Sequence, residues 1–298
     1  MKIKWSDLLL FIFPAFFLYT IFVVYPFISS IYLSLFSWVG VGAKKYVGLK
    51  NFFEVLFGSF KGEFFNAFWH NIYFFIVVSI IEVSLGFIIA LGLATQIKGY
   101  HVFRSIVYLP NVISMVLVGF IWGLILNPQI GLINQFLKAI GLGSLTRPWL
   151  GDPGLAFNTI IAVNIWRHLG FYVLVMLAAI INIQPDFIEA AYIDGASNLD
   201  VVKNVIVPLT IPTAQTLILL LFIWSFSVFE LVYALEGVQA GPFRSTDVLG
   251  TLFYRTAFGG LGSARMDLGL GAAIVTLMFI VILPISFIYV RLVERRRT

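Results

Sequence analysis

Residues 184–208 read QPDFIEAAYIDGASNLDVVKNVIVP, a polar stretch between two long apolar runs. Asp186 followed three residues later by Glu189 is a capping-box pattern, which predicts that a short helix begins there and continues to about Ile193. Gly195 is placed to end this helix, because glycine readily adopts the left-handed conformation that closes many helices at their carboxyl end.

A second short helix is expected directly after the first. Ser197 with Asp200 repeats the capping pattern and predicts a helix that continues to about Val207. Pro208 is expected to stop that helix where the next apolar run begins. The whole stretch therefore predicts a compact helix-turn-helix in water between two membrane spans.

The composition of the chain is that of a membrane protein. Of its 298 residues, 11% are charged and 60% are hydrophobic, and the mean hydropathy is +1.00, whereas a soluble domain is about a quarter charged. Cysteine is absent, which excludes disulfides, thiol nucleophiles and thiolate metal sites. The net charge of +5 does not indicate a nucleic-acid partner, because the basic residues are scattered apart from Arg295, Arg296 and Arg297. Such a tail is typical of a cytoplasmic anchor beside a membrane.

Six apolar stretches are long enough to cross the hydrocarbon layer, which takes about 20 residues of helix. Because lipid offers no partner for open backbone groups, and the runs lack the alternation of barrel strands, we expect helices. The predicted fold class is an all-α membrane protein with one transmembrane domain over residues 1–298. The expected spans are Leu8–Ile31, Ile72–Ala94, Val102–Leu126, Ala156–Ile181, Ile211–Leu235 and Leu268–Val290.

The distribution of charges predicts that both termini are cytoplasmic. Lys2 and Lys4 precede the first run, which is too long for a signal peptide and lacks an A-x-A cleavage site, so we expect it to be retained. With both termini inside, Lys and Arg are denser in the cytoplasmic segments than in the external loops, and Arg291 with the basic tail contributes most. In this orientation the stretch 184–208 is cytoplasmic.

The stretch 184–208 resembles the EAA motif of permease subunits of binding-protein-dependent ABC importers: Glu-Ala-Ala, two residues, Asp-Gly-Ala and a proline about a dozen residues later. The matching residues are Glu189, Ala190, Ala191, Asp194, Gly195, Ala196 and Pro208. Other stretches are similar to the maltose/glycerol-3-phosphate type within this family, so the resemblance covers nearly the whole chain. These stretches include Tyr25-Pro26, Val47-Gly-Leu-Lys-Asn-Phe52, Leu109-Pro110 and Trp149-Leu-Gly-Asp-Pro153.

The resemblance implies an ABC type I importer permease fold with six transmembrane helices in the cytoplasmic (inner) membrane. In that family the EAA loop is a coupling helix that docks in a cleft of an ATPase subunit. The implied partners are a second homologous permease, two ATP-binding cassette subunits and an extracytoplasmic solute-binding protein. The implied activity is import of a sugar by alternating access, with ATP and Mg bound by the partner ATPases and no cofactor bound by this chain.

Polar residues inside the spans mark a candidate solute path, because ionisable groups at membrane depth usually face the bundle interior or water. Asn164, His168 and Phe171 share one face of the fourth span by their i, i+4 and i+7 spacing. Amide and imidazole groups are suited to hydrogen-bond sugar hydroxyls, and a ring is suited to stack on the C–H surface of a sugar. Trp224 and Ser225 in the fifth span, which also flanks the EAA loop, are further candidates. Interhelical packing is the structural alternative for each of them.

Three more ionisable groups, Glu82, Arg167 and Glu230, lie in or beside the spans without a partner that the sequence identifies. Glu82 requires a buried partner or water.

Catalytic signatures are absent from the sequence. It contains no G-x-x-x-x-G-K-[ST], no H-E-x-x-H and no G-x-S-x-G, so we expect neither catalytic residues nor a metal site, and ATP would be hydrolysed by another chain. Two alternatives stay open. An ion-driven secondary transporter would take up solute without an ATPase, and a membrane-embedded enzyme would need a catalytic cluster.

Overall fold

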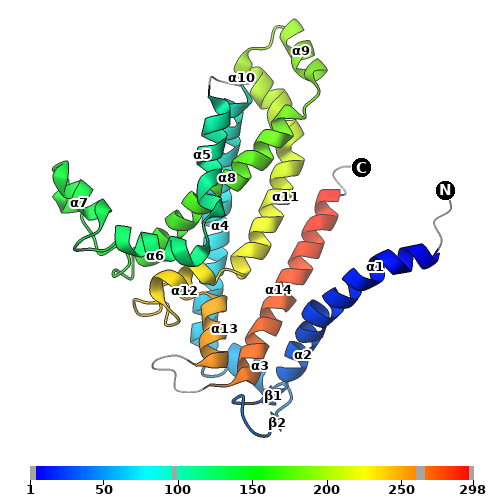
Figure 1. Ribbon diagram of the computed structural model, residues 1–298, viewed down its shortest axis with the longest axis vertical. Helices are drawn as coiled ribbons and strands as arrows, with labels where there is room; N and C mark the ends of the chain where they lie inside the picture. Colours follow the sequence, from blue (N-terminus) through cyan, green and yellow to red (C-terminus); the bar gives the residue numbers. More distant parts are fainter. Residues whose placement is uncertain (1–4, 96–98, 260–265, 295–298) are drawn as a thin grey trace. The chain divides into compact units, whose positions relative to one another are not determined.

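The computed structural model describes residues 5–95, 99–259 and 266–294 (Figure 1). Lys2, Lys4, Arg295, Arg296 and Arg297, on which the predicted orientation partly rests, lie outside these ranges. The chain divides into two compact units, Met1–Phe65 with Leu252–Val281 and Asn66–Thr251 with Ile282–Thr298. Three helices contribute residues to both units: α4 (Lys61–Ala94), α13 (Leu249–Phe258) and α14 (Leu268–Glu294).

The predicted all-α membrane fold is confirmed. Five helices among the described residues are long and apolar enough to cross a membrane, and the count becomes six if one sharply bent pair forms a single span. The second of them begins well before the predicted boundary, because α4 continues into a polar first turn at Lys61. The five are Phe11–Leu33, Lys61–Ala94, Ala156–Ile181, Asn198–Phe226 and Leu268–Val293.

The first unit is organised around Asp267. Its carboxylate accepts hydrogen bonds from the backbone N–H groups of Gly269 and Leu270, at 2.9 and 3.1 Å, and thereby caps the start of α14. The same carboxylate accepts the hydroxyl of Ser37 at 2.6 Å, which joins the short β-ladder to α14. The other elements of this unit are α1 (Trp5–Tyr19), the π-helical turn η1 (Thr20–Val24), α2 (Tyr25–Leu33), the antiparallel pair β1 (Phe36–Ser37) and β2 (Lys45–Tyr46), and α3 (Lys50–Leu56).

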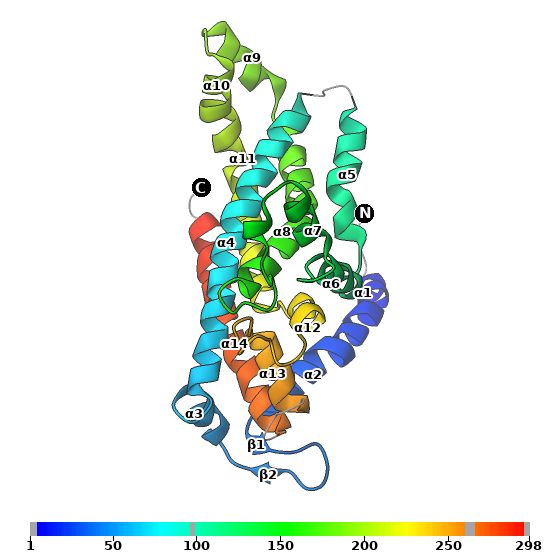
Figure 2. The same ribbon diagram turned by 90° about the vertical axis from the view of Figure 1, so that its left-hand side faces the viewer.

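The second unit holds the central helices of the sequence (Figure 2). Its elements besides the shared helices are α5 (Tyr100–Val112), α6 (Met115–Ile125), α7 (Leu132–Ala139), the 3₁₀ turn η2 (Gly143–Leu145), α8 (Ala156–Ile181), α9 (Pro185–Ile193), α10 (Asn198–Val201), the π-helical turn η3 (Val202–Ile206), α11 (Val207–Phe226) and α12 (Glu230–Glu236). In both views α9 and α10 lie beyond the ends of α8 and α11.

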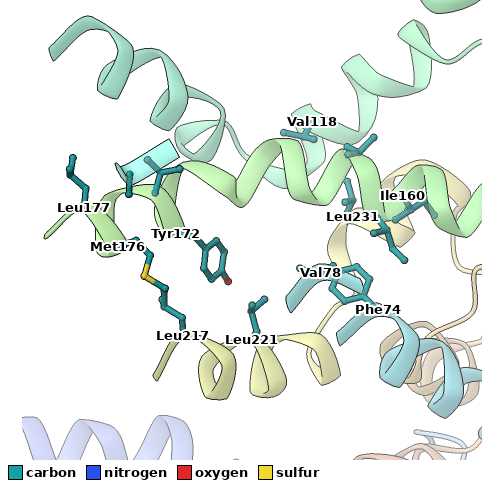
Figure 3. Close-up of a cluster of buried hydrophobic side chains, with 14 of the residues drawn as sticks. Phe74, Val78, Val118, Ile160, Tyr172, Met176, Leu177, Leu217, Leu221 and Leu231 are labelled. Carbon is teal, nitrogen blue, oxygen red and sulfur yellow. The ribbon is translucent and has the colours of Figure 1, made fainter. Parts of the chain in front are cut away.

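Helix α8 is the centre of this unit. Figure 3 shows its Ile160, Tyr172 and Met176 among side chains from α4, α6, α11 and α12. Gly170 allows α8 to approach α5 closely. A Cβ at this position would lie 2.3 Å from the Val107 carbonyl oxygen of α5. Membrane helices rely on such contacts because lipid tails remove the hydrophobic drive between helices.

The third predicted span, Val102–Leu126, is not one straight helix. It forms α5 and α6, which meet at an angle of 97°. Ile113 and Ser114 are extended between the two helices, and Ser114 Oγ accepts the N–H of Leu117 at 3.4 Å as the cap of α6. The prediction failed because a serine cap inside an apolar run does not change its hydropathy.

The fifth predicted span, Ile211–Leu235, is shifted toward the carboxyl end by comparison with the structure. The helix is continuous from Asn198 to Phe226, and α12 is separate. Pro208 does not stop the helix as predicted, because the preceding turn η3 is widened so that Val207 N–H bonds to the Val202 carbonyl, five residues back. The wider turn removes the need for the N–H that proline lacks.

The first span uses the same arrangement at Pro26. In η1 the N–H of Tyr25 bonds to the Thr20 carbonyl, again five residues back and one residue before the proline. Pro26 and Pro208 both belong to the stretches that resemble the permease family. In each case a π-turn ends on the residue directly before the proline.

Gly170→Ala should destabilise the second unit, because its Cβ would meet backbone atoms of α5 that cannot move aside independently. We expect a loss of about 1–3 kcal/mol, seen as a lower Tm of the purified protein. Gly92→Ala in α4 is the matched control, since no atom of residues 5–95, 99–259 or 266–294 lies within 4 Å of its added Cβ. An equal Tm for the two variants would contradict the packing described here.

Glu236, at the end of α12, gives a pH-dependent contribution to stability. Burial raises the pKa of its carboxyl to about 7, and Oε1 has no hydrogen-bond partner within the described ranges. Because the pKa in the folded state lies above the ordinary value of 4.5, this group favours folding at low pH and the contribution is lost as the pH rises through about 7.

Glu236→Gln should therefore raise the Tm more at pH 8 than at pH 5, by removing the cost of a buried charge. Asp186→Asn neutralises an exposed carboxyl of α9 and should leave the original pH dependence in place. The Tm of each purified variant across this pH range is the measurement, and a parallel curve for Glu236→Gln and the parent protein would refute the assignment.

Candidate functional site

A cavity of about 400 Å³ lies inside the second unit, within the size range of small-molecule sites. Its wall is formed by α4, the junction of α5 and α6, α8, the end of α11 and the segment that leads into α12. The lining residues are Phe74, Glu82, Asn111, Met115, Asn164, His168, Phe171, Tyr172, Leu221, Trp224, Ser225, Ser227, Val228, Phe229, Glu230 and Leu231.

All five residues predicted to line a solute path border this one cavity. Asn164, His168 and Phe171 come from one face of α8, as their spacing predicts, and Trp224 and Ser225 come from the last turn of α11. The rings of Phe171 and Trp224 are 5.7 Å apart between centroids, so the two helices present a joined aromatic surface. The role of these residues in transport stays a prediction.

Glu82, which the sequence leaves without a partner, is fully buried against α8. Its Oε1 accepts Nδ2 of Asn164 at 3.4 Å, and Tyr172 also lies beside the carboxyl group. Close approach of α4 and α8 at this level requires Gly86, where a Cβ would be 2.9 Å from Cβ of Tyr172. Oε2 of Glu82 has no hydrogen-bond partner among the described residues, although an unpaired buried polar atom is costly.

Arg167 hydrogen-bonds the backbone at the bend between α5 and α6. Its Nε and Nη2 donate to the carbonyl of Ile113 at 3.0 and 2.9 Å, which satisfies a backbone oxygen that the bend leaves outside any helix. The sequence identifies Arg167 as an unpaired membrane cation, but the acceptor could not be inferred because it is a backbone atom at an unpredicted break.

His168 is held by the same arrangement. Its Nε2 lies 2.7 Å from Nη1 of Arg167, and its Nδ1 lies 3.2 Å from the Asn164 carbonyl oxygen. Because a guanidinium only donates, Nε2 must accept and Nδ1 carries the hydrogen. Neither ring nitrogen is then free. His168 lines the cavity with both ring nitrogens engaged by the protein, and the expected hydrogen bond from its imidazole to a sugar hydroxyl stays a prediction.

Asn71 of α4 fixes the end of α11 from outside the cavity. Its Nδ2 donates to the Ser225 carbonyl at 2.5 Å, and its Oδ1 accepts the N–H of Leu249 at 2.9 Å. Ser225 lines the cavity, and its buried hydroxyl has no hydrogen-bond partner in the described part of the chain. Asn71 thus holds the backbone at Ser225, whose side chain is fully buried.

Sequence reasoning missed several residues of the wall. Tyr172 and Phe229 carry no distinguishing signal in a chain that is 17% aromatic. Asn111, a polar residue directly after Pro110 within an apolar run, was a usable sign that the helix ends nearby.

The predicted elbow between the fourth and fifth spans is present. α9 ends in a Schellman motif, in which Gly195 has a φ of +84°, Ala196 N–H bonds to the Ala191 carbonyl at 3.0 Å and Gly195 N–H bonds to Tyr192. The Ala191, Gly195 and Ala196 positions of the EAA pattern therefore build the end of the helix. No atom of the residues that the structure describes lies within 4 Å of an added Cβ on Gly195, so glycine is required there for its backbone conformation.

The capping predictions for the elbow had different outcomes. The Ser197–Asp200 capping box at the start of α10 is confirmed. The Asp186–Glu189 box is wrong, because α9 begins one residue earlier with Pro185 in its first turn and Gln184 as a cap without a side-chain bond. The elbow carries exposed apolar side chains on a polar segment, namely Phe187, Tyr192, Ile193 and Leu199.

Long apolar helices that border one cavity, with an exposed helix-turn-helix elbow between two of them, are the features of a membrane transport subunit. Residues 82–298 match the family described as binding-protein-dependent transport system inner membrane component, and the chain belongs to this family.

Relatives and a solved structure agree with this assignment. The chain is 32% identical to the probable ABC transporter permease protein YurN of Bacillus subtilis, over 95% of this chain and 94% of the relative. It is 30% identical to the trehalose/maltose transport system permease protein MalF of Thermococcus litoralis, over 97% and 94% of the two chains. The structure of a bacterial alginate ABC transporter in complex with a periplasmic protein is similar, with a TM-score of 0.82 and 26% identity over 97% and 95% of the chains.

Arg167→Lys should lower stability by about 1.5 kcal/mol, because a lysine cannot make the two-fold contact with the Ile113 carbonyl. Arg147→Lys is the matched control. Arg147 also donates to backbone carbonyls, but from an exposed loop, so its replacement should change stability by less than about 0.5 kcal/mol. Thermal melting of the purified variants tests this difference, and equal losses would argue against a special role for Arg167.

Proposed function

We propose that this chain is the channel-forming permease subunit of an ATP-driven importer for a sugar or oligosaccharide. The observation that carries the proposal is the exposed α9–α10 elbow, which joins the two helices that form the cavity wall. The relatives support the choice of solute, because one is named as a trehalose/maltose permease and the similar solved structure is an alginate transporter.

The elbow has the properties of a docking surface for a separate ATPase. None of the residues of α9 is buried, and Ile193 is 85% exposed although it is strongly apolar. A water-side segment with such side chains is stabilised when a partner covers them. Glu189 is also exposed and offers a charge to that partner. In this proposal each of two ATP-binding cassette subunits holds one elbow, and ATP and Mg are bound there, not by this chain.

The remaining partners and the orientation follow from the same proposal. A second homologous permease completes the pathway, and an extracytoplasmic solute-binding protein delivers the sugar. The elbow is cytoplasmic, as are both termini. Closure of the ATPases around ATP moves the elbows, and the spans then alternate between inward-facing and outward-facing states. The membrane cavity needs only weak affinity, because capture is assigned to the binding protein.

Gly195→Ala should uncouple hydrolysis from transport. Alanine in the left-handed conformation costs about 1–2 kcal/mol, so the Schellman motif opens and the angle between α9 and α10 changes. The test uses vesicles with the complete transporter and an external binding protein loaded with maltotriose, in which uptake and ATP hydrolysis are measured together. We expect the uptake per ATP hydrolysed to fall several-fold, and Glu189→Gln to reduce it in the same direction.

Gly99→Ala is the matched control for this experiment. Gly99 has a φ of +85° and no atom of the described residues within 4 Å of an added Cβ, but it lies at the start of α5, away from the elbow sequence. The same strain there should leave the coupling ratio unchanged. If Gly195→Ala and Gly99→Ala behave alike, the elbow is not the coupling element, and uptake that needs no ATP would favour an ion-driven transporter.

A further inference from the structure

We propose that residues 237–248, which we call the α12–α13 loop, form a rigid docking surface for the extracytoplasmic solute-binding protein, with Phe243 and Arg244 as its anchors. The inference rests on the proposed function for the presence of a binding protein and for the orientation of the chain. Figure 1 and Figure 2 both place α12 at the opposite end of α11 from α9 and α10. A cytoplasmic elbow therefore puts the α12–α13 loop on the external side.

The tip of the loop presents an aromatic ring to water. Phe243 is 94% exposed, the highest value among the large apolar side chains that the structure describes, and Arg244 beside it is exposed too. Aromatic and arginine side chains are the usual anchors of protein–protein interfaces. A single exposed ring is common on protein surfaces, and what distinguishes this one is the backbone that carries it.

That backbone is strained at the tip. Ala240, Phe243 and Arg244 have φ values of 49°, 53° and 61°, and within the described ranges they are the non-glycine residues with a positive φ. Residues with a Cβ rarely adopt this left-handed conformation, least of all bulky ones such as phenylalanine. Such strain persists only where the surrounding contacts impose it, and it is concentrated at functional sites.

Thr246 imposes the conformation from inside the loop. Thr246 and Ala240 are both fully buried. The Thr246 hydroxyl donates to the Gly241 carbonyl at 2.8 Å, and the Thr246 N–H donates to the Ala240 carbonyl at 3.4 Å. The base of the loop is therefore packed and hydrogen-bonded while the Phe243 ring projects from it.

Helix α4 holds the outgoing end of the loop. Nδ2 of Asn66 donates to the Arg244 carbonyl at 3.3 Å, and that carbonyl also accepts the Asp247 N–H at 3.2 Å. Nδ1 of His70 lies 2.7 Å from the Asp247 carbonyl oxygen. The tip is thus fixed before any partner arrives, which reduces the ordering cost of binding.

The position of the loop favours the binding protein as the partner. α12 starts with Glu230 and Leu231 on the cavity wall and ends at Glu236, where the loop begins. A protein that releases sugar into the cavity from outside must approach this wall. Lipid adapts to an apolar surface of any shape, whereas a fixed ring beside a cation matches an apolar pocket with a carboxylate at its rim. The similar alginate transporter was solved in complex with a periplasmic protein.

The test measures how the maltotriose-loaded binding protein stimulates ATP hydrolysis by the complete transporter in vesicles. The concentration of binding protein at half-maximal stimulation reports docking. We expect Phe243→Ala to raise this concentration about tenfold or more and to leave the hydrolysis rate without binding protein unchanged. Arg244→Glu should also raise it, and by a smaller factor at high salt, because salt screens the attraction between charges.

Two variants separate docking from general effects. Phe136→Ala is the matched control, because Phe136 of α7 is 64% exposed but belongs to a different connection between spans, and it should leave the half-maximal concentration unchanged. Thr246→Val removes the hydroxyl of a buried residue that cannot touch the partner. It should raise the half-maximal concentration several-fold by releasing the tip, with a maximal rate equal to that of the parent. The Tm of each purified variant shows whether the fold is retained.

Cross-linking identifies the partner independently. Because the chain contains no cysteine, Phe243→Cys provides one thiol on this subunit for a benzophenone-maleimide label. Illumination in the presence of the loaded binding protein should join the two proteins, and the same label at Phe136→Cys should not. A cross-link from position 243 only to the second permease, or only to lipid, would overturn the assignment.

Failure of this inference differs from failure of the proposed function. If the binding protein stimulates the parent, Phe243→Ala and Arg244→Glu at the same half-maximal concentration, docking through the α12–α13 loop is overturned while sugar import stands. If the parent complex neither responds to the binding protein nor imports maltotriose, the proposed function itself is overturned, and the docking surface with it.

Discussion

Hydrocarbon offers no hydrogen-bond partner, so every interruption of a membrane helix must be satisfied by the protein itself. The interruptions in this chain obey that constraint by different means. The bend after α5 exposes the Ile113 carbonyl, and the Arg167 guanidinium occupies it. Ahead of Pro26 and Pro208 the backbone widens into a π-turn. The bend places Asn111 and Met115 on the cavity wall, so the contact between Arg167 and Ile113 helps to shape that part of the wall.

The same constraint gives meaning to polar atoms that remain unpaired. The backbone groups at the helix interruptions have hydrogen-bond partners. By contrast, a carboxyl oxygen of Glu82 and the hydroxyl of Ser225 have none among the described residues, which is unusual for buried polar atoms. Both face one cavity, and both helices that present them are fixed by other contacts, through Gly86 for α4 and through Asn71 for α11. Both side chains nevertheless have no accessible surface, so they belong to the packed contact between the helices behind the cavity wall.

The sequence predicted those features that depend on local patterns. Apolar length identified the spans, the spacing of Asn164, His168 and Phe171 identified a shared face, and the Ser197–Asp200 pair identified a helix start. The failures lie where backbone geometry depends on distant groups. An apolar run does not reveal a 97° bend, and a proline does not reveal the π-turn that accommodates it. The partners of Glu82 and Arg167 were unpredictable for the same reason, because a backbone carbonyl and a tyrosine carry no signature of their role.

The continuity of the fifth span links the elbow with the cavity. One helix extends from its capping box at Ser197, through η3, to Trp224 and Ser225, and at 1.5 Å per residue it is about 40 Å long. Because this helix is continuous, it connects α10 directly with the cavity wall at its other end. α8 joins the same elbow through residues 182–184 and carries Asn164, the partner of Glu82. A motor that grips the elbow would therefore act on both helices at once, and the contact between Asn164 and Glu82 is where that movement would change the cavity.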